Sequence, residues 1–197
     1  DIIRFYKTGG ERTGHGEKMN RRLRHLMRGT TQREALEFFD SLEAVEPDFM
    51  KGLWKGSEMP SGHPMDGLLT LVPWYGKRFV NAENVHPLVM IDKQKRLYSV
   101  NPDLLLKFAE MSVKFKMRSE MKNAHIFDGF LKIFTTKKSK ARLREVKFRG
   151  VMTAAMIYDN LKIIDIFRKV DENTVLGVMD FKGRMHETYY FFVLRRK

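Results

Sequence analysis

The sequence of 197 residues contains no cysteine, which excludes disulfide bonds, thiolate metal ligands and a cysteine nucleophile. It also lacks any run of about 18 apolar residues, the length that a membrane-spanning helix needs. The 6 histidines form no HxH or HxxxH pair and have no acidic cluster beside them at ligand spacing. We therefore predict no metal site and no transmembrane segment, and we expect a cytoplasmic protein.

Acidic residues are scarce relative to basic ones, and the formal net charge is +13. Clustered lysine and arginine favour a nucleic-acid or anionic-membrane partner, because neutralised phosphates release counterions. The charges are spread along the chain, without a helix-turn-helix pattern, zinc-finger spacing or aromatic RNA-binding signature. We expect a solvated basic surface and no specific nucleic-acid partner. A basic interaction module is a third option for the function.

Residues 1–29 are basic and glycine-rich, without a sustained apolar period. They also lack the apolar core of a signal peptide, although their composition is compatible with a targeting segment. We expect an irregular basic segment over 1–29 and a barrel domain over 30–197.

Thr31-Gln32-Arg33-Glu34 has the spacing of a capping box, and the apolar residues after it follow a helical stripe. This pattern predicts a helix over 32–43. Proline and glycine then mark a turn, and a short helix is expected over 64–71. Further strands are expected over 78–81, 87–92 and 95–100, followed by a helix that starts after Asn101.

The C-terminal third consists of β-branched and aromatic runs separated by short turns. The runs are 143–148, 151–158, 162–170, 174–179 and 188–195. Five strands joined by short turns predict an antiparallel meander over about 140–197. With the strands expected within about 32–110, this meander can close into a single barrel. We therefore predict a mainly β protein with a few short helices.

Several motifs follow one another along the chain. They are Gly52-Leu53-Trp54-Lys55-Gly56, Gly62-His63-Pro64-Met65-Asp66-Gly67, Trp74-Tyr75-Gly76-Lys77-Arg78-Phe79, Arg149-Gly150-Val151, Met156-Ile157-Tyr158-Asp159 and Gly177-Val178-Met179-Asp180. By these motifs the chain resembles the bacterial GXWXG family, in which a domain with the first motif precedes a conserved C-terminal domain of unknown function. The resemblance covers roughly residues 32–197.

The first motif is similar to the Gly-X-Trp of lipocalins, fatty-acid-binding proteins and haem-binding nitrobindins. The resemblance implies a calycin-like antiparallel barrel whose closed end is plugged by Trp54. In those barrels the tryptophan packs against an arginine of the final strand, and Arg195 or Arg196 has the matching position. Cation–π stacking combined with barrel closure gives this pair a structural role.

The loop after the first motif contains polar candidates for a ligand site. His63 and Asp66 belong to a glycine- and proline-rich turn that is pre-shaped at little entropic cost, and Trp74 and Tyr75 follow it. We expect these four residues to orient a ligand. Alternatively, His63 and Asp66 cap the short helix expected after them. We expect the ligand to approach from this loop and not from residues 1–29.

Two further candidates for ligand binding, Tyr158 and Asp165, lie in the predicted C-terminal strands. A buried ionisable group must be paired or hydrogen-bonded, so an inward-facing Asp165 forms an internal salt bridge or anchors a ligand. Asp165 and Arg168 face opposite sides of one strand, because side chains alternate along a strand. Both flanking sets are apolar, and we favour Asp165 as the inward residue.

The leading hypothesis is a protein that binds or sequesters a small, mostly apolar molecule inside the barrel, such as a fatty acid, isoprenoid, polyketide or tetrapyrrole. The 13 methionines and 15 phenylalanines suit an adaptable apolar pocket, and they also suit a core. The alternative is a cyclase, isomerase or hydrolase whose active site is the same cavity, with Tyr, Asp or His as the acid–base group. No motif indicates a particular cofactor or oligomeric state.

Overall fold

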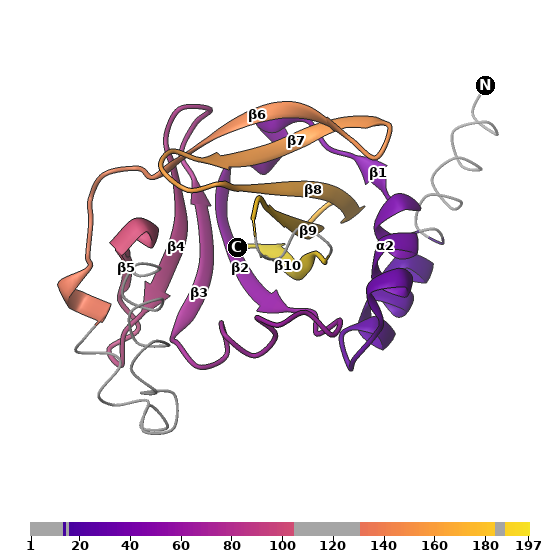
Figure 1. Cartoon of the computed structure of the whole chain (residues 1–197), viewed down its shortest axis with the longest axis horizontal. Coiled ribbons are helices and arrows are strands. Elements are labelled where there is room, and N and C mark those ends of the chain that lie inside the picture. Colours follow the sequence, from indigo (N-terminus) through magenta and orange to yellow (C-terminus); the bar gives the residue numbers. More distant parts are fainter. Residues whose placement is uncertain (1–13, 15, 105–130, 184–187) are drawn as a thin grey trace, which may run out of the picture.

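The computed structural model describes residues 14, 16–104, 131–183 and 188–197. Eight strands form a closed antiparallel barrel in the ring order β8-β7-β6-β4-β3-β2-β10-β9, and pairing of β8 with β9 completes the ring (Figure 1). The strands are β2 (Gly52–Glu58), β3 (Trp74–Phe79), β4 (Val85–Ile91), β6 (Ala141–Phe148), β7 (Val151–Tyr158), β8 (Ile163–Asp171), β9 (Thr174–Phe181) and β10 (Tyr190–Arg196). The predicted mainly β barrel is therefore confirmed.

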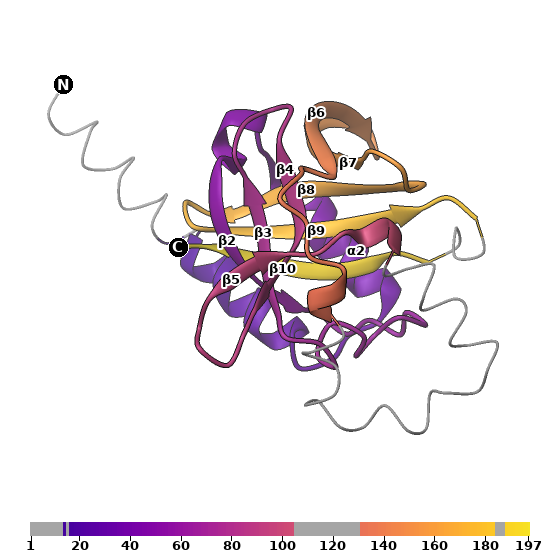
Figure 2. The same cartoon turned by 90° about the vertical axis from the view of Figure 1, so that its left-hand side faces the viewer.

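Two short strands extend the sheet beyond the ring. β1 (Glu43–Ala44) pairs with β8, and β5 (Leu97–Ser99) pairs with β4. In Figure 2, β8, β9 and β10 run across β2, β3 and β4 at a steep angle. These two groups of strands form two walls of the barrel, and the side chains that alternate inward from both walls fill the space between them.

The predicted capping box begins the helix α2 (Gln32–Asp40). Thr31 Oγ1 accepts a hydrogen bond from the Glu34 backbone N–H at 3.2 Å, and the Glu34 carboxylate accepts one from the Thr31 N–H at 3.1 Å. These two bonds satisfy N–H groups that have no partner within the helix. A 3-10 turn, η1 (Pro47–Met50), then leads into β2.

The short helix predicted over 64–71 is wrong, because these residues form successive turns. The backbone N–H groups of Gly67 and Leu69 donate to the Glu58 carboxylate, and are therefore not used in a helical ladder. The helix expected after Asn101 lies largely outside the described residues, which include only three helical positions there, 102–104.

Residues 16–26 are helical, so the expectation of irregular structure over 1–29 is wrong for this part. Met19, Leu23 and Leu26 are buried and pack together with α2 on the outside of the barrel. Their spacing of four and three residues puts them on one helical face. The N-terminal helix and α2 together cover the outer face of β8, β9 and β10.

The barrel interior contains a chain of aromatic rings in edge-to-face contact. The ring centroids of Phe79 and Phe167 are 5.7 Å apart, those of Phe167 and Phe192 are 6.2 Å apart, and those of Phe192 and Trp74 are 6.3 Å apart. Such contacts add stability beyond the burial of apolar area. The centre of the barrel is thus a packed core.

The closed end of the barrel is built around Trp54, which is fully buried. The Arg196 guanidinium lies 4.3 Å from the Trp54 ring centroid and donates hydrogen bonds to the carbonyls of Lys51 and Phe49, at 2.9 and 2.7 Å. Trp54 Nε1 donates to the Met50 carbonyl at 2.7 Å. The expected tryptophan–arginine pair is therefore formed with Arg196.

Arg195, the other arginine offered for this role, has a different environment. Its side chain is exposed on the outer face, where it contacts Ser57 and Met27. Adjacent residues of a strand face opposite sides, so only one of the two arginines can reach Trp54.

The Trp54–Arg196 closure predicts a large loss of stability in the variant Trp54→Ala. Removal of the indole leaves a cavity that the surrounding strands fill only in part, which costs roughly 3–5 kcal/mol. In a thermal melt, each kcal/mol corresponds to about 2–4 °C for a chain of this size. The measurement is the melting temperature of the variant beside that of the wild type.

Arg196→Ala and Arg195→Ala provide a matched pair of neighbouring arginines. Arg196→Ala removes the cation above Trp54 and two hydrogen bonds to backbone carbonyls, so it should lower the melting temperature more than Arg195→Ala. Equal melting temperatures for these two variants, or an unchanged one for Trp54→Ala, contradict the proposed closure.

Candidate functional site

β2 and β3 separate halfway along β2. Their pairing runs from Gly52↔Phe79 to Lys55↔Gly76 and ends there, whereas β2 continues to Glu58 paired only with β10. Residues 59–73 connect the two strands and pass along the gap between them. The open edge of β2 therefore interrupts the barrel wall.

Two glycines determine where the strands separate. At Gly76 a Cβ atom would lie 2.0 Å from the Trp54 carbonyl oxygen, so the backbones are too close for any side chain. At Gly56 a Cβ atom would lie 2.1 Å from the Trp74 ring. The second glycine of the Gly52–Gly56 motif is thus needed because the Trp74 indole lies directly on it.

A pocket of about 400 Å³ lies at this gap. Its walls come from the end of the N-terminal helix, the edge of β2, the connecting loop and the start of β3. The lining residues are Met27, Gly56, Ser57, Glu58, Pro60, Leu69, Thr70, Val72 and Trp74. Neighbouring residues of β2 face opposite sides of the sheet, so the pocket extends around the strand edge from the inner to the outer face.

Asp66 and Glu58 fix the connecting loop over the pocket. Asp66 Oδ2 accepts hydrogen bonds from the N–H groups of Ser61, Gly62 and His63, at 2.8, 2.8 and 2.9 Å. The Glu58 carboxylate accepts from two N–H groups further along the loop, at 3.1 and 2.7 Å. Asp66 therefore holds the loop as expected of a capping residue, although no helix follows.

His63 is buried beneath the same loop. Its Nδ1 accepts a hydrogen bond from the Met65 N–H at 3.1 Å, and its ring lies edge-on to Tyr190 at 5.5 Å between centroids. Burial lowers the pKa of His63, and the nearby Asp66 carboxylate opposes this shift in part. The imidazole is therefore neutral at neutral pH and acts as an acceptor within its own turn.

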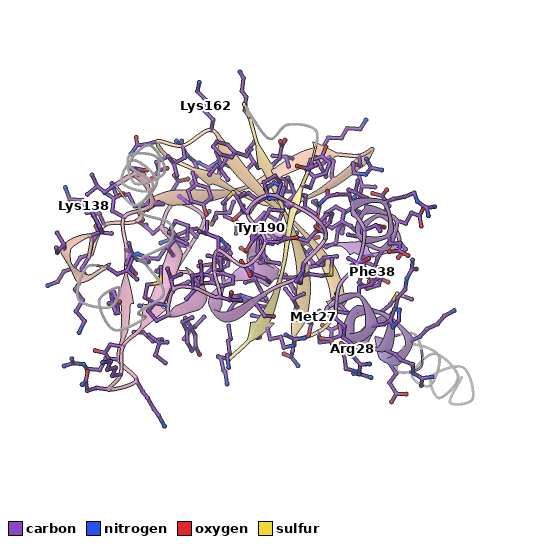
Figure 3. All side chains as sticks on the ribbon, turned by 60° about the horizontal axis from the view of Figure 1, so that its bottom comes forward. Met27, Arg28, Phe38, Lys138, Lys162 and Tyr190 are labelled. Atoms are coloured by element: carbon purple, nitrogen blue, oxygen red, sulfur yellow. The ribbon has the colours of Figure 1, made fainter. Side chains whose placement is uncertain are left out.

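The hydroxyl of Tyr190, which lies near the centre of the molecule in Figure 3, donates a hydrogen bond to Glu58. Burial raises the pKa of Tyr190, and the Glu58 carboxylate raises it further. Tyr190 therefore remains protonated and supplies Glu58 with a permanent donor. Glu58 is the acidic residue of the pocket, and its charge is compensated by these donors.

A second polar cluster lies in the barrel core. Lys77 Nζ lies 2.8 Å from Asp165 Oδ2, 3.2 Å from the Pro87 carbonyl oxygen and 3.5 Å from the Tyr158 hydroxyl. The contact with Asp165 is an ion pair without an aligned hydrogen bond, and both carboxylate oxygens lack a hydrogen-bond partner among the described residues. Burial raises the pKa of Asp165 despite the opposing Lys77 charge, and raises the pKa of Tyr158.

Five of the six residues expected at the site occupy three places. Trp74 lines the pocket, His63 and Asp66 shape its loop, and Tyr158 and Asp165 lie in the core cluster. Tyr75 is half-buried at the start of β3 and does not line the pocket. Asp165 faces inward as predicted, while Arg168 packs on Phe39 outside the barrel, 5.3 Å from the ring centroid.

Four important residues were missed by the sequence analysis: Met27, Glu58, Lys77 and Tyr190. Alternation along the strands places Glu58 on the same side as Trp54, and Lys77 on the same side as Phe79, so this signal was available for two of them. Met27 lines the candidate pocket, whereas the sequence led us to expect a site independent of residues 1–29.

The described residues contain neither a metal-binding cluster nor a helix able to span a membrane. No group of three or more His, Asp or Glu side chains in that part of the chain is placed to hold a metal ion. None of the helices described there has the length and apolar character needed to cross a membrane.

Two family models match separate segments of the chain. Residues 37–95 match the model described as "GXWXG protein", and residues 139–196 match the model described as "Domain of unknown function (DUF4334)". No curated protein matches. A crystal structure of a protein from Thermomonospora curvata is similar at 33% sequence identity, with a TM-score of 0.59, and the alignment covers 82% of this chain and 84% of that one. The chain belongs to the GXWXG family, whose C-terminal domain has no assigned function.

Proposed function

We propose that this protein binds a small, mostly apolar molecule in the pocket at the open edge of β2. The observation that supports this is a pocket of about 400 Å³ where β2 and β3 separate. Ligand sites for small molecules span about 300–1,000 Å³ and combine apolar walls with a few polar groups. The ligand types we propose are a fatty acid, an isoprenoid, a polyketide or a tetrapyrrole. The pocket volume favours the smaller of these molecules.

The pocket is pre-shaped, which favours binding. Its loop is held by hydrogen bonds to the buried Glu58 carboxylate and the half-buried Asp66 carboxylate, so little conformational entropy remains to be lost when a ligand enters. Apolar contacts come from Met27, Leu69, Val72 and Trp74. Trp74 contributes its indole to this apolar wall, and its Nε1 is buried without an acceptor among the described residues.

The proposed location differs from the barrel interior that the sequence suggested. The interior rings of Phe79, Phe167 and Phe192 are packed edge to face. Trp74 contacts this core on one side and lines the pocket on the other. We therefore assign the ligand to the gap in the barrel wall.

Val72→Trp tests the pocket directly. The added indole would occupy much of its volume, so we expect the affinity for the uncharged fluorescent probe N-phenylnaphthylamine to fall at least about tenfold, or about 1.4 kcal/mol. The matched control is Val80→Trp, since Val80 is 53% exposed and lies outside the pocket. The measurement is a fluorescence titration of both variants and the wild type.

Equal affinity of the two tryptophan variants would show that the probe binds elsewhere, and the proposal would then be wrong. Native mass spectrometry of protein purified from its own source would complement the titration by identifying a co-purified ligand.

A second candidate function is acid–base catalysis in the barrel core. The observation that favours it is Asp165, whose buried carboxylate has no hydrogen-bond partner among the described residues while Lys77 and Tyr158 lie beside it. Such a group of perturbed ionisable residues is common in active sites. A test is hydrolysis of p-nitrophenyl butyrate: a wild-type rate above that of Asp165→Asn would support catalysis, and equal rates would argue against it.

If Lys77 and Asp165 form a structural ion pair, single and double variants should differ in stability. Lys77→Met leaves a buried carboxylate without its cation and should cost roughly 3–5 kcal/mol in free energy of unfolding. The double variant Lys77→Met/Asp165→Leu removes both charges and should regain most of this loss. Urea unfolding measures both, and additive losses in the double variant would contradict the pairing.

A further inference from the structure

The outer rim of the pocket is cationic. Arg195 projects from the outer face of β10, where its Nη1 lies 3.3 Å from Ser57 Oγ and its Nη2 lies 3.4 Å from Met27 Sδ. Ser57 and Met27 both line the pocket. The two contacts therefore place the Arg195 guanidinium at the pocket mouth.

No acidic side chain neutralises Arg195 within the described part of the chain, where its partners are a hydroxyl and a thioether. Two more exposed cations are neighbours of these residues, one in the sequence and one in the sheet. Arg28 follows Met27, and Lys55 is the β2 partner of Arg195 in the register. Figure 3 shows Met27 and Arg28 at the end of the N-terminal helix.

The acidic residue inside the pocket does not cancel this positive rim. The Glu58 carboxylate is buried and is already bonded to the N–H groups of Gly67 and Leu69 and to the hydroxyl of Tyr190. These three donors compensate the Glu58 charge, although the residue lines the pocket. An anion at the mouth would interact mainly with Arg195, with Lys55 as its neighbour across the β2–β10 pairing.

We propose that the ligand is an amphipathic carboxylate, with its apolar chain in the pocket and its carboxylate on Arg195. This inference rests on the proposed function and specifies its ligand class. A guanidinium presents a planar fork of donors that matches the two oxygens of a carboxylate. Its present acceptors are weak, so a carboxylate can replace them. A neutral apolar molecule of the same length would gain nothing from this rim.

Dodecanoate and dodecanol differ only in the headgroup, and their displacement of N-phenylnaphthylamine tests the proposal. We expect wild-type protein to bind dodecanoate about fivefold more tightly than dodecanol at low salt, because exposed ion pairs contribute at this scale. The preference should shrink as ionic strength rises. Arg195→Gln should lower the affinity for dodecanoate to about that for dodecanol.

Lys138→Gln is the control for charge, since Lys138 is exposed and lies on the far side of the molecule from Met27 in Figure 3. It removes one positive charge and should retain the preference for dodecanoate. Melting temperatures of both variants verify that they are folded.

The outcomes separate this inference from the function on which it rests. If dodecanol binds and Val72→Trp blocks it, but Arg195→Gln leaves dodecanoate affinity unchanged, the pocket stands and the carboxylate assignment is overturned. If neither compound displaces the probe, both proposals fail. Arg195-dependent flotation with phosphatidylglycerol vesicles in the absence of dodecanoate binding would assign Arg195 to a lipid surface and also overturn the proposal.

Discussion

The close approach of β2 and β3 determines where the barrel wall opens and where the pocket forms. At Gly76 the two backbones leave no room for a side chain, and immediately beyond it the Trp74 ring occupies the space above Gly56. The strands cannot remain paired around an indole, so they separate. The pocket, its loop and the exposed edge of β2 all follow from this one steric constraint. The paired half of β2 contains Trp54, which seals the closed end of the barrel.

The carboxylates of Asp66, which is half-buried, and of Glu58 and Asp165, which are buried, are compensated in two different ways. Asp66 and Glu58 accept backbone N–H groups, and thereby convert a loop without regular structure into a fixed wall. Asp165 relies instead on the single ammonium of Lys77 in an apolar interior. Hydrogen bonds to backbone N–H groups fix the conformation of the loop. A single buried ion pair, in contrast, contributes little net stability, and loss of one partner is strongly destabilising. The rigidity of the pocket therefore comes from the first two residues.

Much of the fold could be predicted because its signals are local. Alternation and turn residues identify the C-terminal strands, and the capping box identifies α2. The N-terminal helix carries a signal as well, in the spacing of Met19, Leu23 and Leu26, but the surrounding glycines and charges obscure it. The pocket could not be predicted, because its lining residues come from segments that are brought together only by the register of the sheet. The same dependence explains the ambiguity between Arg195 and Arg196, which pairing with β2 resolves.

The pairing of β2 with β10 also has a kinetic consequence. Ser57 and Arg195 are 138 positions apart in the chain, whereas the hairpins of β6 to β9 join near neighbours. Contacts of such long sequence separation are entropically costly to form and slow folding. Because Arg196 and β10 cover Trp54, we expect this tryptophan to be enclosed only when the last strand pairs with β2, which would make barrel closure a late event in folding.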